Sequence, residues 1–302
     1  MFGRVDSAGV LRVARSVAIT IQENDKISLQ PVLKWAGGKR QLLSAILPLV
    51  PPDFGLYAEP FLGGGAVLFR LRPERAVISD ANAELINLYT VIRQDVDALI
   101  DALQCHRNDA AYYYAVRNID RNADAYKGLT PVERASRTLY LNKHCYNGLY
   151  RVNRSGHFNT PFGRYRNPTI AGATELRAVS AYLRDADIDI RIGDYAEVCG
   201  TLPAGSFVYL DPPYHPVSGT ANFTGYTAGG FGPAEQERLK LVCDDLTRRN
   251  IRFLLSNSHD DFILDLYREY YIDIVQARRP VNSAAAGRGV VAEVLVRNYP
   301  SA

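Results

Sequence analysis

The chain lacks any hydrophobic run long enough to cross a membrane, although 47% of its 302 residues are hydrophobic. A transmembrane helix needs about 20 consecutive apolar residues. The N-terminus also lacks the compact apolar core of a secretory signal peptide. We therefore expect no membrane partner and a cytoplasmic location. A chain of 302 residues has room for one large α/β domain or two smaller ones.

Cysteine and histidine are too few and too scattered to form a metal site. The four cysteines contain no CxxC pair, and the five histidines show no ligand spacing beside them. Each cysteine is better explained as a small buried hydrophobic residue. These absences predict that the protein uses no metal and works in a reducing compartment.

Acidic residues are missing from one stretch, residues 134–174. The same stretch holds seven basic residues: Arg134, Arg137, Lys143, Arg151, Arg154, Arg164 and Arg166. With these seven set aside, 28 basic residues face 32 acidic ones, so the rest of the chain is net negative although the whole carries +3. Several aromatic residues lie among the basic ones: Tyr140, Tyr146, Tyr150, Phe158, Phe162 and Tyr165. This composition predicts a nucleic-acid-binding surface, whereas a merely solvated basic surface usually carries acids as well.

The motif with the most chemical content is Asp211-Pro212-Pro213-Tyr214, which follows the apolar run 207–210. A short buried strand that ends in two prolines predicts a rigid turn. In that turn, the Asp211 carboxylate and the Pro212 carbonyl could accept both N–H groups of an amino-bearing ring, on which Tyr214 would stack. Such hydrogen bonds free the amino lone pair, otherwise delocalised into the ring, to attack an electrophile. The alternative is a strand that simply ends in two prolines.

A second motif, Glu59 to Ala66, places three consecutive glycines after a predicted strand at 56–59. The pattern predicts a strand, a glycine loop and a helix. A second predicted strand, at 76–80, ends in Asp80, 21 residues beyond Glu59. In doubly wound nucleotide-binding sheets, an acid about 20 residues beyond the glycine turn binds ribose hydroxyls. The loop is not GxGxxG, so it predicts close backbone approach to a ligand but no pyrophosphate site.

The remaining pattern completes an α/β fold. Helical spacing covers 41–49, 83–94 and most of 95–141, and the segment that follows has the turn signals of a hairpin-bearing loop. Further strands are predicted at four places: 188–192, 207–210, 251–255 and 290–297. We expect one α/β sheet interrupted by an inserted segment of helices and a hairpin.

Three motifs occur in this order: Lys34-Trp35-Ala36-Gly37-Gly38-Lys39, Glu59 to Gly65, and Asp211 to Tyr214. Together they resemble the Dam family of DNA adenine-N6 methyltransferases, which are class alpha amino-methyltransferases. Residues 140–165 are similar to the target-recognition segment of its GATC-reading branch, and 221–224 match as well. The resemblance spans roughly 31–299. It implies a Rossmann-like class I S-adenosylmethionine-dependent methyltransferase sheet with an inserted helical and β-hairpin target-recognition domain.

This resemblance implies a division of the chain and an activity. We expect an N-terminal extension at 1–30, a catalytic domain at 31–94 and 176–302, and a target-recognition insertion at 95–175. The implied activity is methyl transfer from S-adenosylmethionine to a flipped adenine in double-stranded DNA within GATC, as in DNA adenine methylation and restriction-modification. We expect a monomer associated with the nucleoid. The alternatives are the same chemistry on cytosine N4 or an RNA adenine, and a catalytically silent DNA-binding regulator, against which the intact Asp211 to Tyr214 turn argues.

The resemblance also implies which residues bind the cofactor. Trp35 and Lys39 match positions in the cofactor pocket, Asp80 matches the ribose-binding acid, and Asp211 matches the point where cofactor and adenine meet. Asp194 and Tyr195 are expected beside the cofactor's adenine. The full expected sets are Asp211, Pro212, Pro213 and Tyr214 for catalysis, and Trp35, Lys39, Glu59, Phe61, Gly63, Gly65, Asp80, Asp194, Tyr195 and Asp211 for the cofactor. The segment Gly37 to Arg40 is not GxxxxGK[ST], which argues against an NTPase.

The DNA contacts follow from the same resemblance. Arg151 matches an arginine that reads guanine, a contact worth about 1–3 kcal/mol of discrimination. Leu149 and Pro161 match apolar groups near a thymine methyl, and the Asn147 region fills the gap left by the flipped base. The full expected DNA-binding set is Lys34, Tyr146, Asn147, Leu149, Arg151, Asn153, Pro161, Arg164, Tyr165 and Asn222.

Overall fold

Short apolar runs form a seven-stranded sheet in the part of the chain that this computed structural model describes, residues 29–35, 37–166, 168, 170, 172–215, 231–278 and 290–301. The strands are β1 (Tyr57–Glu59), β2 (Arg75–Asp80), β3 (Asp187–Ile192), β4 (Phe207–Leu210), β5 (Arg252–Ser258), β6 (Tyr271–Arg278) and β7 (Val290–Arg297). Their spatial order is β3-β2-β1-β4-β5-β7-β6. Strands β1 to β5 pair in parallel, whereas β7 runs antiparallel between β5 and β6. The predicted fold class is confirmed.

Eleven α-helices lie among the described residues. They are α1 (Leu43–Ile46), α2 (Ala66–Leu71), α3 (Ala83–Gln94), α4 (Val96–Gln104), α5 (Ala110–Asn118), α6 (Ala123–Lys127), α7 (Pro131–His144), α8 (Ala173–Asp185), α9 (Tyr195–Gly200), α10 (Pro233–Arg248) and α11 (Asp261–Leu266). Short 3₁₀ helices are η1 (Lys39–Gln41), η2 (Leu47–Leu49), η3 (Ile119–Arg121) and η4 (Tyr146–Gly148). The helix predicted at 83–94 is confirmed, and it begins there because the Asn82 side chain accepts hydrogen bonds from the first-turn amides.

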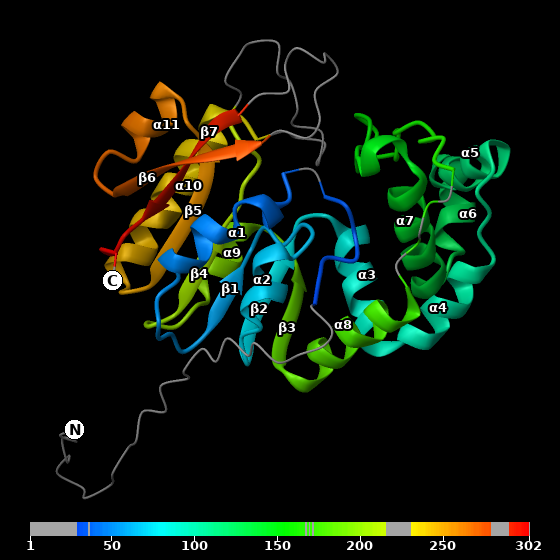
Figure 1. Cartoon of the computed structure of the whole chain (residues 1–302), viewed down its shortest axis with the longest axis horizontal. Helices are drawn as coiled ribbons and strands as arrows, with labels where there is room; N and C mark the ends of the chain where they lie inside the picture. The colour runs from blue at the N-terminus through cyan, green and yellow to red at the C-terminus, as the bar shows by residue number, and fades with distance from the viewer. Residues whose placement is uncertain are drawn as a thin grey trace, which may run out of the picture.

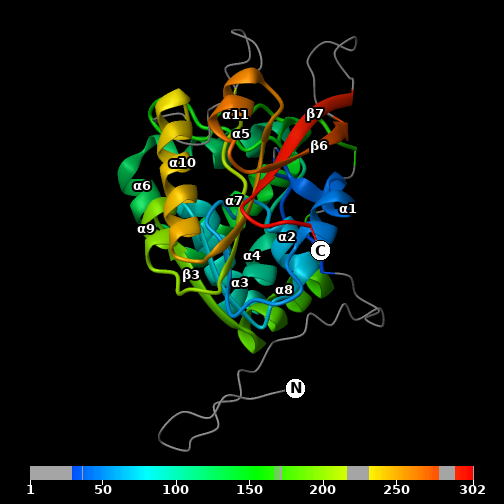
Figure 2. The same ribbon diagram turned by 90° about the vertical axis from the view of Figure 1, so that its left-hand side faces the viewer.

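Helices cover both faces of the sheet, and the strands supply an apolar side chain to each face in turn. In β4, Phe207 and Tyr209 belong to the core cluster on one face, and Val208 and Leu210 to the cluster on the other. Figure 2 shows α9 and α10 on one side of the sheet and α1 and α2 on the other. Because both faces are covered, β4 reads as a continuous apolar run, as parallel central strands do.

A helical lobe, which contains helices α4 to α7, lies beside the sheet on the side of β3 (Figure 1). It has a small core of its own, made of Tyr113, Val116, Tyr140, Leu141, Cys145, Tyr150 and Phe158. However, Leu99 of α4 and Leu139 of α7 belong to the core cluster of the sheet. The lobe and the sheet therefore share buried residues, and the predicted division at residues 94 and 176 stays a prediction.

Strand β6 was not predicted from the sequence. It lies at the edge of the sheet, and its Tyr271 and Ile274 are half exposed or more, at 50% and 58%. An edge strand lacks the dense apolar run that marks a central one. Among the described residues, no helix is long and apolar enough to span a membrane. Residues 1–28 of the predicted extension, and Asn222, lie outside the described residues.

The central strand β5 provides a test of the core. Leu254 is fully buried between β4 and β7, so Leu254→Ala should lower the free energy of unfolding by about 2–5 kcal/mol because it leaves a cavity. Leu241 on α10 is 68% exposed, and Leu241→Ala should change it by less than about 0.5 kcal/mol. Equal effects of the two substitutions in urea unfolding would contradict this core.

Candidate functional site

The carboxyl ends of β1, β2, β4 and β5 meet at one edge of the sheet, because these strands pair in parallel. Open α/β sheets bind ligands in the crevice outside this edge. The glycine loop follows β1, Asp80 ends β2, and Asp211 follows β4 directly. The loop is tied to the neighbouring strand by a hydrogen bond from the Leu62 amide to the Ser79 carbonyl, 2.9 Å long. The tertiary structure thus brings together two motifs that lie about 150 positions apart in the sequence.

Asp211 is paired with Lys39. The Lys39 Nζ lies 2.7 Å from Asp211 Oδ1, and the Lys39 side chain is only 5% exposed. The same ammonium group donates to the Gly37 carbonyl at 2.6 Å. Among the described residues, no hydrogen bond reaches the other carboxylate oxygen, Oδ2. Lys39 therefore holds one oxygen of Asp211 and leaves the second available to a ligand.

Burial and neighbouring charges set the protonation of Asp211. The pKa of its carboxyl is raised to about 6, chiefly by burial and less by the nearby Glu293 carboxylate, while the Lys39 charge opposes this rise. Desolvation penalises the charged form of an acid, and a cation within a few ångströms favours it. Asp211 is therefore a carboxylate at neutral pH and becomes a carboxylic acid under mildly acidic conditions.

Tyr214 is held from two sides. Its hydroxyl donates a hydrogen bond to Glu293 Oε2 of β7 at 2.7 Å. The Lys39 Nζ lies 4.7 Å from the centroid of its ring, a distance at which a cation is attracted to an aromatic face. Burial raises the pKa of Tyr214 well above its ordinary value. The ring is therefore neutral and fixed next to the Asp211–Lys39 pair.

Glu59 lies beneath the glycine loop and is 2% exposed. Its Oε2 accepts hydrogen bonds from the Tyr57 hydroxyl at 2.7 Å and the Leu68 amide at 3.0 Å. Its pKa is raised to about 8, chiefly by burial and less by the nearby Asp211 carboxylate, while the hydrogen bond from Tyr57 opposes this rise. The structure therefore places this expected cofactor residue in the floor of the site, where it anchors the start of α2.

Asp80 and the glycine loop meet at the ends of β1 and β2. Asp80 Oδ2 accepts from the Gly63 amide at 3.0 Å, and Oδ1 accepts from the Asn82 amide at 2.9 Å. Gly63 has a φ of +48°, and a Cβ atom there would lie 2.7 Å from Trp35 Cδ1. Only glycine permits both this backbone and this close approach. The loop, Trp35 and Asp80 thus form one continuous wall.

Asp194 and Tyr195 begin α9, beyond the end of β3. Both oxygens of Asp194 accept from the Arg238 guanidinium, at 2.6 and 2.8 Å, and this pairing lowers the pKa of the carboxyl. The Tyr195 ring stacks on Phe61, with centroids 4.9 Å apart. Three expected cofactor residues thus form one aromatic and charged corner. A contact between Asp194 and a cofactor adenine has to be made beside Arg238.

The expected DNA-contacting residues lie on a hairpin that follows α7. Isolated bridges join Cys145 to Phe162 and Val152 to Phe158. At its start, Tyr146 is 54% exposed and Asn147 has a φ of +56°. Left-handed backbone is uncommon outside glycine and is best tolerated by asparagine and aspartate. The predicted hairpin is confirmed, and it presents Tyr146 and Asn147 to solvent.

Arg151 is exposed, and its Nε donates to Asn159 Oδ1 at 2.7 Å across the hairpin. Asn153 has a different place, because its Oδ1 accepts from the Ser155 and His157 amides at 3.0 Å each. Its side-chain oxygen therefore closes the hairpin turn. Leu149 is partly buried, whereas Pro161 and Arg164 are exposed.

Lys34 connects this hairpin to the edge of the sheet. Its backbone amide donates to Asn142 Oδ1 at 2.9 Å, and the Asn142 amide group donates back to the Lys34 carbonyl at 2.7 Å. The Lys34 ammonium lies 5.2 Å from the centroid of the Tyr165 ring. The segment that carries Lys34, Trp35 and Lys39 therefore contacts the hairpin at one end and Asp211 at the other.

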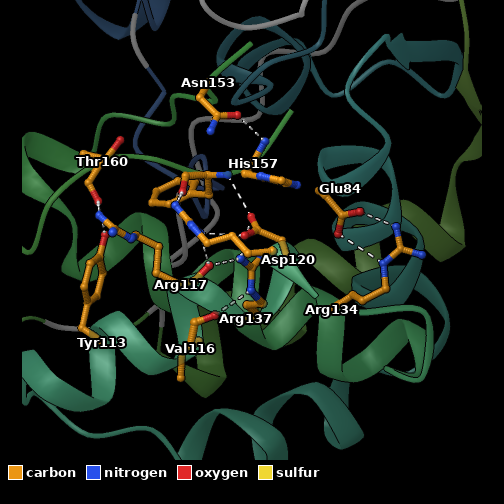
Figure 3. A network of polar contacts seen from close by, with 12 residues as sticks. Glu84, Tyr113, Val116, Arg117, Asp120, Arg134, Arg137, Asn153, His157 and Thr160 are labelled. Carbon is orange, nitrogen blue, oxygen red and sulfur yellow. Dashed lines mark hydrogen bonds and ion pairs between the residues drawn. The ribbon is translucent and has the colours of Figure 1, made fainter. Parts of the chain in front are cut away.

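A buried ion pair anchors the hairpin to the helical lobe (Figure 3). Asp120 Oδ2 lies 2.9 Å from a terminal nitrogen of Arg137 and accepts from the Phe158 amide at 2.8 Å. Arg137 also donates to the carbonyls of Val116 and Arg117. These contacts hold the returning side of the hairpin, opposite Arg151. The position of Arg151 in the hairpin therefore depends on helices that precede it in the sequence.

Comparison with known proteins identifies the family. Residues 35–281 match the family described as "D12 class N6 adenine-specific DNA methyltransferase". This chain belongs to that family. The methyltransferase transfers a methyl group from S-adenosylmethionine to N6 of adenine in DNA.

The methyltransferase is similar to three known methyltransferases over nearly the whole length of each. It is 40% identical to "Type II methyltransferase M1.LlaDCHI" of Lactococcus lactis subsp. cremoris, over 93% of this chain and 99% of that protein. It is 40% identical to "Type II methyltransferase M.MjaIII" of Methanocaldococcus jannaschii, over 90% of this chain and 100% of that protein. "DNA adenine methylase" of Escherichia coli (strain K12) is 35% identical, over 89% of this chain and 95% of that protein.

The residues at the sheet edge fit S-adenosylmethionine. The Asp80 carboxylate suits a ribose diol, and the glycine loop lets a ligand approach the backbone closely. The aromatic corner of Phe61 and Tyr195 suits an adenine ring. The Asp211 carboxylate suits a neighbouring positive charge. Trp35, Gly63 and Gly65 line the same edge, so the expected cofactor residues of the methyltransferase lie together, with Glu59 below them.

Sequence reasoning missed several residues that the structure places around the site. Glu293 holds Tyr214, Arg238 pairs with Asp194, and Asp120 anchors the hairpin. Arg238 and Asp120 carry no motif, since helices contain many such residues. Glu293 is a charged residue in an otherwise apolar run that becomes β7, and this break in the pattern was the one available signal.

The Asp211–Lys39 pair predicts the pH dependence of the methyltransferase. Asp211 carries a negative charge and accepts through both oxygens only when it is ionised, so kcat/KM for S-adenosylmethionine should fall as the pH drops through about 6. The Lys39 charge lowers the pKa of Asp211, so Lys39→Met should move this decline to higher pH. Lys240, which pairs with Asp244 on α10, provides the control, and Lys240→Met should leave the profile unchanged. An unmoved decline in Lys39→Met would contradict this pairing.

Proposed function

We propose that the methyltransferase acts on duplex DNA, flips the adenine of GATC out of the helix and methylates it in the turn Asp211 to Tyr214. We also propose that it works as a monomer associated with the nucleoid. The observation that carries the proposal is the geometry of Asp211, whose Oδ1 is held by Lys39 at 2.7 Å next to the Tyr214 ring. This arrangement supports a site for a flat ring with an amino group.

The protein's contribution to the reaction is positioning and electrostatics. S-adenosylmethionine, when bound, supplies an electrophilic methyl group on a positively charged sulfur. Asp211 Oδ2 and the Pro212 carbonyl accept the two N–H groups of the adenine, so that its nitrogen lone pair is free to form the bond to the methyl carbon. The carbon–sulfur bond breaks with its electrons left on sulfur, and one amino proton leaves to solvent. Tyr214 stacks on the ring during this step.

The assignment of GATC rests on the hairpin. Its residues match the GATC-reading branch of the Dam family, and Arg151 is exposed with its Nε already bound to Asn159. We expect the exposed guanidinium to make a bidentate contact to guanine O6 and N7. Leu149 and Pro161 flank Arg151 in the hairpin and suit the methyl group of thymine. Tyr146 and Asn147 project from its start toward the gap of a flipped base.

The division of labour within the chain is also a proposal. We assign residues 31–94 and 176–302 to catalysis and residues 95–175 to target recognition. The separate cluster around Tyr140 and Phe158 supports this division. Because α4 shares the core of the sheet, we expect the two parts to unfold together.

Transfer of tritiated methyl from S-adenosylmethionine to a duplex with one GATC tests the proposed function. Scrambled and fully N6-methylated duplexes are the controls. We expect label on the GATC adenine alone, and no transfer by Asp211→Ala although it still binds the duplex. Label on every unmethylated duplex would remove the GATC assignment. Turnover by Asp211→Ala would remove the catalytic role of the turn.

Arg151 tests how the sequence is read. Arg151→Ala should lower the preference for GATC over a duplex with a replaced guanine by about 1–3 kcal/mol, roughly 5- to 150-fold, as measured by kcat/KM. Arg154 is exposed on the same hairpin, and Arg154→Ala should weaken binding to both duplexes alike. Equal losses on both duplexes in Arg151→Ala would reduce Arg151 to a phosphate contact.

A further inference from the structure

Two buried amide side chains hold the backbone of the turn that follows β4. Gln236, in the first turns of α10, donates from Nε2 to the Pro213 carbonyl at 3.0 Å. Asn257, near the end of β5, accepts from the His215 amide through Oδ1 at 3.3 Å. The two side chains also bond to each other, because Asn257 Nδ2 donates to Gln236 Oε1 at 2.9 Å. Both are fully buried.

The direction of this chain of hydrogen bonds is forced by the backbone atoms at its ends. The Pro213 carbonyl only accepts, so Gln236 must present its NH₂ group to it. The Gln236 oxygen therefore faces Asn257, which must present its own NH₂ group. The Asn257 oxygen then faces the His215 amide, and it also accepts from the Ser258 amide at 2.9 Å. Neither side chain can turn over without leaving buried polar groups unpaired.

The hydrogen bonds among the described residues do not include the Pro212 carbonyl. Among the described residues, hydrogen bonds reach the Pro213 carbonyl and the His215 amide, and none reaches the Pro212 carbonyl. Proline supplies no amide hydrogen, so side chains must provide the bonds that hold such a turn. The turn is therefore fixed on the side of α10 and β5, while the Pro212 carbonyl stays available as an acceptor.

We propose that Gln236 and Asn257 are positioning residues for methyl transfer, which direct the Pro212 carbonyl and the Asp211 carboxylate toward the adenine amino group. This inference rests on the proposed function of the turn. Their bonds to the turn are to its backbone, at the Pro213 carbonyl and the His215 amide, so they act through Pro213 and His215. Misplacement of a catalytic group by about 1 Å can cost roughly a hundredfold in rate. Loss of the pair should therefore slow the chemical step and leave cofactor binding intact.

The network continues beyond the amide pair and ties it to α11. Ser258 Oγ donates to Asp260 Oδ2 at 2.5 Å. Asp260 Oδ2 also lies 3.3 Å from Nδ1 of His215. Asp260 also caps α11 by accepting from the Ile263 amide. The His215 end of the turn thus has a second anchor. We expect the turn to loosen at Pro213 first when Gln236 is changed.

Single-turnover methyl transfer, normalised to bound S-adenosylmethionine, tests the proposal. Normalising to bound cofactor counts only folded protein. Gln236→Glu places a carboxylate oxygen against the Pro213 carbonyl, and Gln236→Met removes the donor without adding charge. Both should lower the single-turnover rate roughly ten- to a hundredfold, with the cofactor Kd within about threefold of wild type. An unchanged rate per bound cofactor in either folded variant would overturn the proposal.

Asn257→Asp tests the forced direction. The new carboxylate can accept from Gln236, so Gln236 must turn its NH₂ group away from Pro213. The turn then loses its bond at Pro213, although the substituted side chain does not touch that carbonyl. The double variant with Gln236→Met should be no slower than the slower single variant. Additive losses in rate would mean that the two amides act independently and would overturn the proposal.

Asn298 provides the matched control. Its side chain spans the opposite ends of β5 and α10, where it accepts from the Phe253 amide at 2.9 Å and donates to the Ile251 carbonyl at 2.9 Å. Asn298→Asp removes a comparable amide far from the turn, and its single-turnover rate per bound cofactor should equal that of wild type. A loss equal to that of Gln236→Glu would show a general packing effect and would overturn the positioning role.

Asp211→Ala, measured in the same assay, distinguishes a failure of the proposed function of the turn from a failure of the positioning role of Gln236 and Asn257. If Asp211→Ala transfers methyl as wild type does, the proposed function of the turn fails. If Asp211→Ala is inactive and the Gln236 variants are unimpaired, only the positioning role fails.

Discussion

The structure of the site depends on one buried ion pair, between Lys39 and Asp211. Removing two charges from water is expensive, and their mutual attraction repays this only with good geometry and further partners. Here the partners are the Gly37 carbonyl and the Tyr214 ring. The pair joins the first residue of η1 to the residue after β4, and the two are 172 positions apart in the sequence. It also fixes one oxygen of Asp211, so that a contact which holds the fold together sets the orientation of this carboxylate as well.

From this pair, contacts spread in two directions. On one side, the segment that carries Lys39 continues to Lys34, whose backbone exchanges hydrogen bonds with Asn142 at the end of α7. The turn Asp211 to Tyr214 and the hairpin after α7 are thereby linked through a short segment. On the other side, Gln236 and Asn257 hold the turn against α10 and β5. A D12 class adenine methyltransferase must hold a base and a methyl donor in line, and these contacts supply the rigidity that such alignment needs.

Much of the fold and of the candidate site could be predicted from the sequence. β4 is buried on both faces and appears as an uninterrupted apolar run, and α3 appears through its period and its cap. Asp211, Asp80 and the glycine loop stand at strand ends, where a local pattern marks them. The edge strand β6 could not be found in this way, because it is partly exposed and its sequence lacks a continuous apolar run. Of the partner residues, Glu293 is marked only as a charge within an apolar run. Arg238 and Asp120 could not be found, since each is an ordinary polar residue in its own element.

The sequence by itself therefore determined the kinds of groups in the site and their order, through motifs whose residues are neighbours in the chain. Only the tertiary structure decided how those groups are held: that Lys39 takes one oxygen of Asp211, that Glu59 lies below the loop, and that Asp194 is paired with Arg238. The physical reason is that side-chain pairing across strands and helices depends on sheet register and helix rotation. Those are properties of the packed core, and no local stretch of sequence carries them.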